Sequence, residues 1–308
     1  MHAFDLHCDT LFKANEENGS VINNNYHFSF EKAMKYDKYI QVMAVWIPDE
    51  YRGNKAFELV NKCSFLLESE LKKSEKFRKI DDFSKLSAGD YNVVLAVEGG
   101  AALCGKLENI AKLRNMGVRF MTLTWNGSNE IGDGILCENP KGLTAFGKQA
   151  ISVLEDNGII IDVSHASESL FWDVAKLAKR PFVATHSNAR SVCGNMRNLT
   201  DEQFKYICEI GGLVGLNFHR YFVSDNGEVD FDDLQKHLEH FLELGGEDVM
   251  ALGSDFDGAD MPDCIKGAES MQNFYNFLLS RNYSENLLNK VFFKNAYDFC
   301  RNYDLNYK

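Results

Sequence analysis

The feature that most constrains the fold of this chain is a recurrence of short, apolar, β-rich segments, separated by longer segments with helical periodicity. This alternation is typical of βα units around a parallel sheet. Eight candidate strands are present, at residues 2–7, 39–46, 92–98, 118–124, 158–164, 181–186, 212–218 and 249–255.

The intervening segments have apolar residues spaced by three and four, as amphipathic helices do. They include residues 55–74, 142–157, 167–178 and 230–244, and turn signals precede strands at SAGD (87–90), LEDNG (154–158) and LELGG (242–246). Eight strands with intervening helices predict an α/β protein with a closed (β/α)8 barrel of the TIM type. An open, doubly wound sheet is the alternative, but no GxGxxG loop or P-loop follows the first strand.

The C-terminal tail and the lack of a linker complete the predicted architecture. Residues 266–305 contain MQNFYNFLLSRN and ENLLNKVFFKNAYDFCRNY, which indicate two amphipathic helices that close the barrel. Only four prolines occur, and no Gly/Ser-rich or Pro-rich stretch separates two halves. Because barrels often reach this size as one unit, we expect a single domain spanning residues 1–308.

Charge, cysteine usage and the N-terminus narrow the expected partners and compartment. The formal net charge of −12 disfavours nucleic acid and anionic membranes, since binding phosphates requires Lys and Arg. The eight cysteines show no CxxC pairing, so we expect free thiols in a reducing cytoplasm. The start MHAFDLHCDT lacks the regions of a secretory signal, and no apolar run approaches the ~18 to 20 residues that span a bilayer. We expect a cytoplasmic protein with no membrane partner.

Histidines and acids stand at the ends of several predicted strands. The C-terminal ends of barrel strands converge on one face, so residues far apart in the sequence can meet there. The residues concerned are His7, Asp9, Glu98, His165, His186 and Asp255. A lone strand-end histidine is more often a packed or capping side chain, and an HxD step alone is a weak motif. Six such residues at one predicted mouth favour a metal site over coincidence.

These residue types suit a two-metal hydrolytic centre. His7 and Asp9 are two residues apart, so in an extended segment both side chains point to the same side and can bind one cation. Imidazole and carboxylate ligands suit zinc and related ions, and Glu98 could bridge two of them. Two cations about 3.5 to 4 Å apart can share a water, lower its pKa and polarise a substrate carbonyl. His219 competes for a ligand role, but its aromatic neighbours favour a position that lines or supports the pocket.

Seven segments in order along the chain resemble those of one known family, the membrane (renal) dipeptidases and their bacterial relatives. The segments are DLHCDT, AVEGG, RFMTLTWN, IDVSHAS, ATHSNAR, NMRNLTDEQ and LGSDFDG, and together they extend over nearly the whole chain. Members of this family are two-zinc peptidases on a metal-dependent-hydrolase barrel. Because they commonly dimerise, the resemblance also implies a homodimer.

The resemblance assigns a role to each matching residue. It implies that His7 and Asp9 bind one zinc ion, that His165 and His186 bind the other, and that Glu98 bridges them. It further implies that Asp255 relays a proton to the departing amine, and that Arg197 binds the substrate carboxylate. These roles agree with the needs of amide hydrolysis, which are an activated water, a carbonyl polariser and a general acid. From the residues alone, Arg197 would be read as a surface salt bridge.

Trp125 departs from the family pattern. The mammalian dipeptidases have a histidine after TLT that contacts substrate and helps to stabilise the tetrahedral intermediate, whereas an indole donates one hydrogen bond and carries no proton. Asn126 or Asn129 in the following loop, or His219 from the opposite side, could supply an oxyanion donor. The departure therefore bears on substrate choice more than on the metal ligands.

We therefore expect a zinc-dependent dipeptidase that acts on small dipeptides with a free carboxylate, including those with a C-terminal D-residue, by a metal-bridged water. The same ligand set could accept Mn, Co or Fe. One alternative keeps the binuclear centre but hydrolyses another small amide, an ester or a lactone. A second alternative, of a different class, is a non-catalytic metal-binding barrel.

Overall fold

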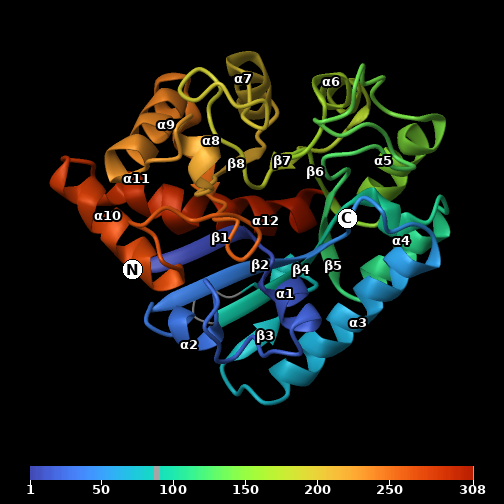
Figure 1. The fold of residues 1–308 in the computed structure, drawn as a ribbon, viewed down its shortest axis with the longest axis horizontal. Helices are drawn as coiled ribbons and strands as arrows, with labels where there is room; N and C mark the ends of the chain where they lie inside the picture. Colours follow the sequence, from blue (N-terminus) through green and yellow to red (C-terminus); the bar gives the residue numbers. More distant parts are fainter. Residues whose placement is uncertain (87–90, 308) are drawn as a thin grey trace.

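Eight parallel strands form the closed barrel that the sequence predicts. The computed structural model describes residues 1–86 and 91–307. Neighbouring strands follow the chain order around the barrel, and β2 pairs with both β1 and β4, so that the sheet closes on itself. Figure 1 shows helices arranged around these strands. The strands are β1 (His2–Cys8), β2 (Lys38–Trp46), β4 (Tyr91–Glu98), β5 (Val118–Thr122), β6 (Ile160–Asp162), β7 (Val183–Ala184), β8 (Leu213–Leu216) and β9 (Met250–Leu252).

Amphipathic helices lie outside the strands, and each predicted helical segment corresponds to one of them. Those helices are α3 (Asn54–Leu71), α5 (Ala145–Asp156), α6 (Glu168–Leu177) and α9 (Phe231–Glu243). Thr144 and Ser167 cap α5 and α6 by accepting backbone N–H bonds, and these caps define where the two helices begin. The other α-helices are α1 (Thr10–Glu16), α2 (Phe30–Ala33), α4 (Glu108–Asn115), α7 (Asp201–Glu209), α8 (Arg220–Val223), α10 (Met271–Ser280), α11 (Glu285–Asn289) and α12 (Asn295–Asn306). Short 3-10 turns span Phe83–Lys85, Gly100–Leu103, Gly246–Asp248 and Ala268–Ser270.

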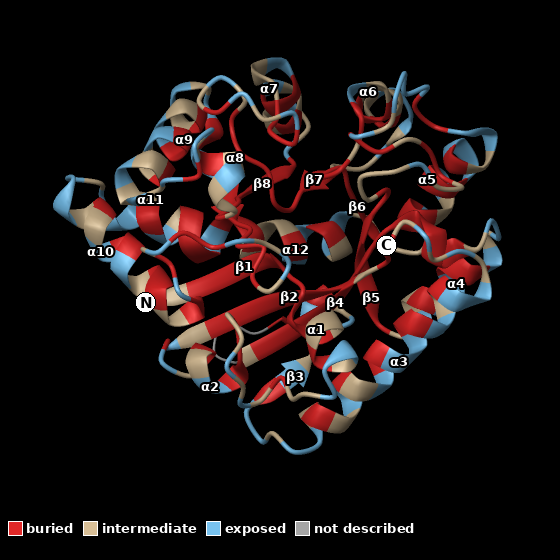
Figure 2. Cartoon of the chain, viewed as in Figure 1, coloured by how far each residue is buried: buried red, intermediate tan, exposed pale blue. Residues whose placement is uncertain are grey.

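The apolar side chains form an outer and an inner core. The outer core joins the strands to the surrounding helices, and Figure 2 shows strands buried along their length and helices buried along one side. The inner core receives side chains from all eight barrel strands and from α12, including Ala296, Cys300 and Tyr303. Because α12 lies beside Leu213 at the start of β8, it closes the end of the barrel opposite to the strand C-termini.

The structure refines the prediction in three places. The predicted last closing helix begins as α11 and passes through a π-helical turn, Lys290–Lys294, into α12. A short strand, β3 (Phe77–Lys79), pairs with the start of β4 and was not predicted, because three residues are too few to show an alternating pattern. The turns at LEDNG and LELGG contain Gly158 and Gly245 at φ of 66° and 95°, which favours glycine.

The turn predicted at SAGD lies outside the described residues. Within the described part of the chain, no helix has both the length and the apolar character needed to cross a membrane.

Candidate metal centre

The six residues predicted to form a metal site meet at the C-terminal mouth of the barrel, and each is at most 8% exposed. Only His7 and Glu98 belong to strands, β1 and β4. The other four lie in the turns that follow strands; His186 and Asp255 do so because β7 and β9 end earlier than predicted. Asp9 is the N-cap of α1 at φ −100° and ψ 11°, so the extended segment ends before it, but its side chain still lies on the same side as that of His7. Asp255 has a φ of 63°, in the left-handed region.

Glu98 lies between the imidazoles and faces them with both carboxylate oxygens. Its Oε1 atom is 2.8 Å from Nε2 of His165 and 3.5 Å from Nε2 of His186. Its Oε2 atom is 3.7 Å from Nε2 of His7, which is itself 3.3 Å from Oδ2 of Asp9. The Nε2 atoms of His165 and His186 are 3.0 Å apart. The Glu98 carboxylate therefore lies between two pairs of possible ligands, His165 with His186 and His7 with Asp9.

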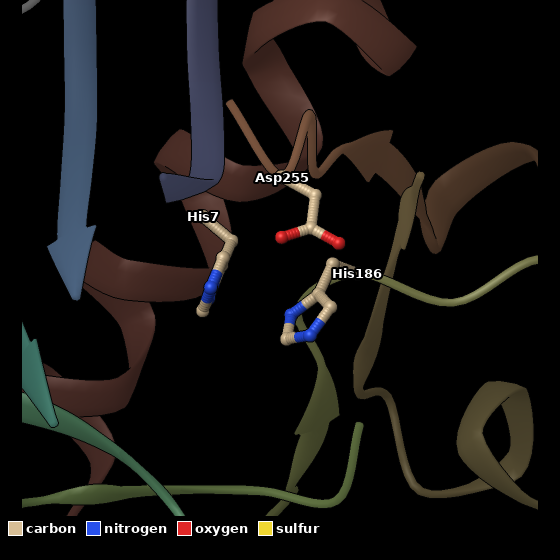
Figure 3. Close-up of side chains that lie close together, drawn as sticks. All are labelled: His7, His186 and Asp255. Atoms are coloured by element: carbon tan, nitrogen blue, oxygen red, sulfur yellow. The ribbon is translucent and has the colours of Figure 1, made fainter. Parts of the chain in front are cut away.

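Asp255 belongs to the same group of buried side chains, which we call the cluster. One ligand atom from each of His7, His186 and Asp255 lies within 4.8 Å of the others. Figure 3 shows the Asp255 carboxylate beside the two imidazoles. Asn217 donates from Nδ2 to Oδ2 of Asp255 over 2.9 Å, which orients the carboxylate. Asp255 can therefore contact either a cation or a group that a cation binds.

Some buried polar atoms of the cluster lack a partner that a cation could supply. Nε2 of His7 and Oδ1 of Asp9 are buried and have no hydrogen-bond partner among the described residues. Each such group costs about 1 to 3 kcal/mol when nothing satisfies it. A Cβ atom at Gly258 would overlap the Asp9 carboxylate, so glycine is needed for this carboxylate to occupy its position. The buried imidazole and carboxylate donors suit a divalent cation.

Electrostatics point the same way. Burial lowers the pKa of His7, but the carboxylates of Glu98, Asp9 and Asp255 outweigh burial and raise this pKa to about 10. Burial raises the pKa of Glu98 well above its usual range, because a buried carboxylate needs a compensating positive charge. A cation bound beside Glu98, or a proton on His7, would supply that charge.

Hydrogen bonds hold the other two histidines, His165 and His186, in the neutral tautomer that metal binding would require. Asn126 Oδ1 lies 3.0 Å from Nδ1 of His165, and because the oxygen can only accept, Nδ1 carries the proton. Thr185 Oγ1 donates to Asp162 and therefore accepts from Nδ1 of His186, which lies 2.8 Å away. In both rings the lone pair of Nε2 points into the cluster. Burial also lowers the pKa of both imidazoles well below its usual range, so both are neutral at pH 7.

Two buried aspartates that support the cluster were not predicted. Asp162 accepts hydrogen bonds from Thr122 (2.5 Å) and Thr185 (2.7 Å) and so links β5 and β6 to the turn after β7. Asp5 accepts from Ser254 (2.6 Å) and Gln41 (3.0 Å) and links β1, β2 and the turn after β9. The sequence contained a signal for both residues, because each is an acid within a mostly apolar strand. An unpaired charge there would be costly, so a buried partner could have been predicted.

A pocket of about 470 Å³ opens onto the cluster. Arg197 is buried in its wall, and its Nη1 donates to the carbonyl of Ser164, while its Nε and Nη2 have no partner among the described residues. Burial lowers the pKa of Arg197 to about 10, so the guanidinium is charged at neutral pH. Arg197 is therefore not the surface salt bridge that the residues alone suggest.

The predicted substrate-contact residues Trp125, Asn126 and His219 also line this pocket. His219 is the N-cap of α8 and lies outside the metal-binding groups found among the described residues. Asn129, which was considered as an oxyanion donor, is absent from the pocket lining and instead bonds to backbone atoms of Leu123 and Ile131.

Comparisons with known proteins identify relatives over most of the chain. A family model described as membrane dipeptidase, peptidase family M19, matches residues 1–304. An uncharacterized protein in the pqqA 5′ region of Klebsiella pneumoniae is 36% identical over 213 residues, which cover 66% of this chain and 79% of that protein. Dipeptidase 3 of Macaca fascicularis is 29% identical over 205 residues, which cover 64% of this chain but only 42% of that protein.

A solved structure shares the whole architecture. It is described as the dipeptidase AC, a metallo peptidase, and it is 25% identical to this chain. The superposition has a TM-score of 0.92 and covers 99% of both chains. The barrel and its surrounding helices thus have a close structural counterpart.

Proposed function

This chain belongs to the membrane dipeptidase family of metal-dependent hydrolases, and from that premise we propose that it hydrolyses small dipeptides with a free C-terminal carboxylate. The proposal includes dipeptides whose C-terminal residue has the D-configuration. The single observation that carries it is the position of Glu98, whose two oxygens face His7 on one side and His165 and His186 on the other.

We propose that the cluster holds two zinc ions. His7 and Asp9 would hold one ion, His165 and His186 the other, and Glu98 would contact both. Mn, Co or Fe would also suit these donors. A divalent cation held there supplies a Lewis acid that polarises the substrate carbonyl and lowers the pKa of water.

Side chains of the protein would bind the substrate carboxylate, transfer a proton and orient the histidines. Arg197 has two unpaired nitrogens and a positive charge, so it can bind the substrate carboxylate through a planar pair of hydrogen bonds. Asp255, which Asn217 orients, would pass a proton to the departing amine. Asn126 and Thr185 hold the imidazoles of His165 and His186 in the tautomer that ligation needs. Burial of the whole cluster strengthens these charge interactions.

A second candidate function uses the same centre on another small amide, an ester or a lactone. Trp125 favours it, because an indole occupies the position where the mammalian dipeptidases have a histidine that helps to stabilise the intermediate. The pocket contains His219 as a further donor, but it stands on a different element.

Substrate panels distinguish the two candidates. Zinc-loaded protein would be assayed against L,L- and L,D-dipeptides beside N-acyl amino acids and lactones of similar size. Turnover of dipeptides above the other classes supports the proposal, and comparing the L,L and L,D sets reveals the stereochemical preference. Turnover confined to N-acyl amino acids or lactones would replace the proposed dipeptidase activity with the second function.

A further inference from the structure

One side of the pocket is apolar and has no task in the proposed hydrolysis. Phe12, Trp46, Trp125 and Leu136 form this side, which we call the apolar wall. The ring centroids of Trp46 and Trp125 are 4.9 Å apart, and those of Phe12 and Trp46 are 5.1 Å apart, both edge to face. Leu136 is 58% exposed at the pocket. Large apolar side chains grouped around a cavity favour an apolar ligand group, because its burial removes both surfaces from water.

The apolar wall is fixed relative to the metal cluster. The backbone N–H of Leu136 donates to the carbonyl of Asn126 over 3.0 Å, and that of Ile135 donates to the carbonyl of His165 over 2.9 Å. Gly134 leaves no room for a side chain against the carbonyl of Trp125. The loop that carries Leu136 is therefore packed directly onto a cluster histidine, and the apolar wall needs little reorganisation to receive a ligand.

Arg197 follows the barrel strand that lies opposite the strand that carries Trp46. Around the barrel, β7 is the fourth strand from β2 in either direction. Trp46 ends β2, whereas Arg197 lies in the long turn after β7, where its Nη1 donates to the carbonyl of Ser164 beside His165. If Arg197 holds the C-terminal carboxylate and the cluster holds the scissile bond, the N-terminal residue of a dipeptide extends toward the apolar wall.

We propose that the apolar wall selects dipeptides whose N-terminal residue has a large apolar side chain, such as leucine or phenylalanine. This inference rests on the proposed dipeptidase function and adds a specificity for one of the two residues. The N-terminal side chain packs against Trp46, Trp125 and Leu136, while the C-terminal side chain stays on the Arg197 side. Trp46 and Leu136 are thus specificity residues that neither bind the cations nor transfer protons.

Rates with the zinc-loaded enzyme on two dipeptide series test the inference. In the first series the N-terminal residue is glycine, alanine, leucine or phenylalanine and the C-terminal residue is alanine; in the second, the same residues vary at the C-terminus. We expect kcat/KM to rise about 10- to 100-fold from Gly-Ala to Leu-Ala or Phe-Ala. The second series should show no comparable rise.

Variants locate the source of the preference. Leu136→Ala and Trp46→Phe should each lower the ratio of kcat/KM for Leu-Ala over Gly-Ala several-fold. The matched control is Leu305→Ala, since Leu305 is 55% exposed at the opposite end of the barrel and should leave the ratio unchanged. Equal rates across the first series, or an unchanged ratio in both variants, would overturn this inference while leaving dipeptide hydrolysis intact. No turnover of any dipeptide would overturn the proposed function as well.

Discussion

The Oε1 atom of Glu98 lies 2.8 Å from the Nε2 atom of His165, and both side chains are buried. Because Asn126 keeps the proton of His165 on Nδ1, the ring cannot donate a hydrogen bond to this carboxylate oxygen. The lone pairs of Glu98 Oε1 and His165 Nε2 therefore face each other in a site of low dielectric. This contact is unfavourable until a cation or a proton lies between the two atoms. The following predictions depend on this arrangement.

Replacing Glu98 by glutamine should remove metal from the cluster. Glutamine has no negative charge and only one oxygen, so it cannot serve two cations at once. We expect metal affinity to fall about 100-fold or more, since even residues that only orient a ligand contribute 10- to 100-fold. Elemental analysis after dialysis measures the change. Glu155→Gln is a matched control, because Glu155 is equally buried but binds backbone N–H groups of Lys179 and Arg180 away from the cluster. Equal metal content in both variants would contradict the role of Glu98.

Replacing Asp255 by asparagine should separate proton transfer from metal binding. If Asp255 relays a proton, kcat should fall about 10²- to 10⁴-fold while metal content stays unchanged. Asp263→Asn, an exposed position beyond the same turn, should have no effect on kcat. Metal loss in Asp255→Asn would instead make Asp255 a ligand, which its closeness to His7 and His186 also permits.

Replacing Arg197 by lysine should weaken recognition of the substrate carboxylate. Lysine keeps the positive charge but loses the planar pair of donors, so we expect KM to rise roughly tenfold or more with a smaller change in kcat. The control is on the substrate side, namely a dipeptide with a C-terminal carboxamide. Parent and variant should process the amide with similar, low efficiency. A variant that is equally impaired on the amide would show that Arg197 acts on something other than the carboxylate.

Metal binding should release protons and strengthen as the pH rises. In the metal-free protein the pKa of His7 is about 10, so its ring is charged at pH 7.5, whereas a metal ligand must be neutral. The proton therefore competes with the cation below pH 10, and apparent affinity should rise by up to about tenfold per pH unit between pH 7 and 10 for each proton displaced. Calorimetry at pH 7.5 in buffers of different ionisation enthalpy counts the protons. A count of zero would refute the pairing of His7 with Glu98 and Asp9.

The sequence by itself determined the barrel and the candidate metal ligands. Apolar periodicity and turn residues are local properties, so they predicted where the eight barrel strands and the main helices lie. Candidate ligands such as His7 and Glu98 could be proposed because every strand of a parallel barrel delivers its C-terminal end to the same mouth, whatever the details of packing. Predicting β3 failed because three residues show no period.

The tertiary structure alone decided how these residues act together. Asp5 and Asp162 meet their partners only because distant strands become neighbours when the sheet closes. The apolar wall joins three separate segments around Phe12, Trp46 and Trp125, and no spacing in the sequence relates them. Distances across a barrel mouth depend on strand order, on strand length and on where each chain turn leaves its strand, and these are properties of the closed sheet as a whole.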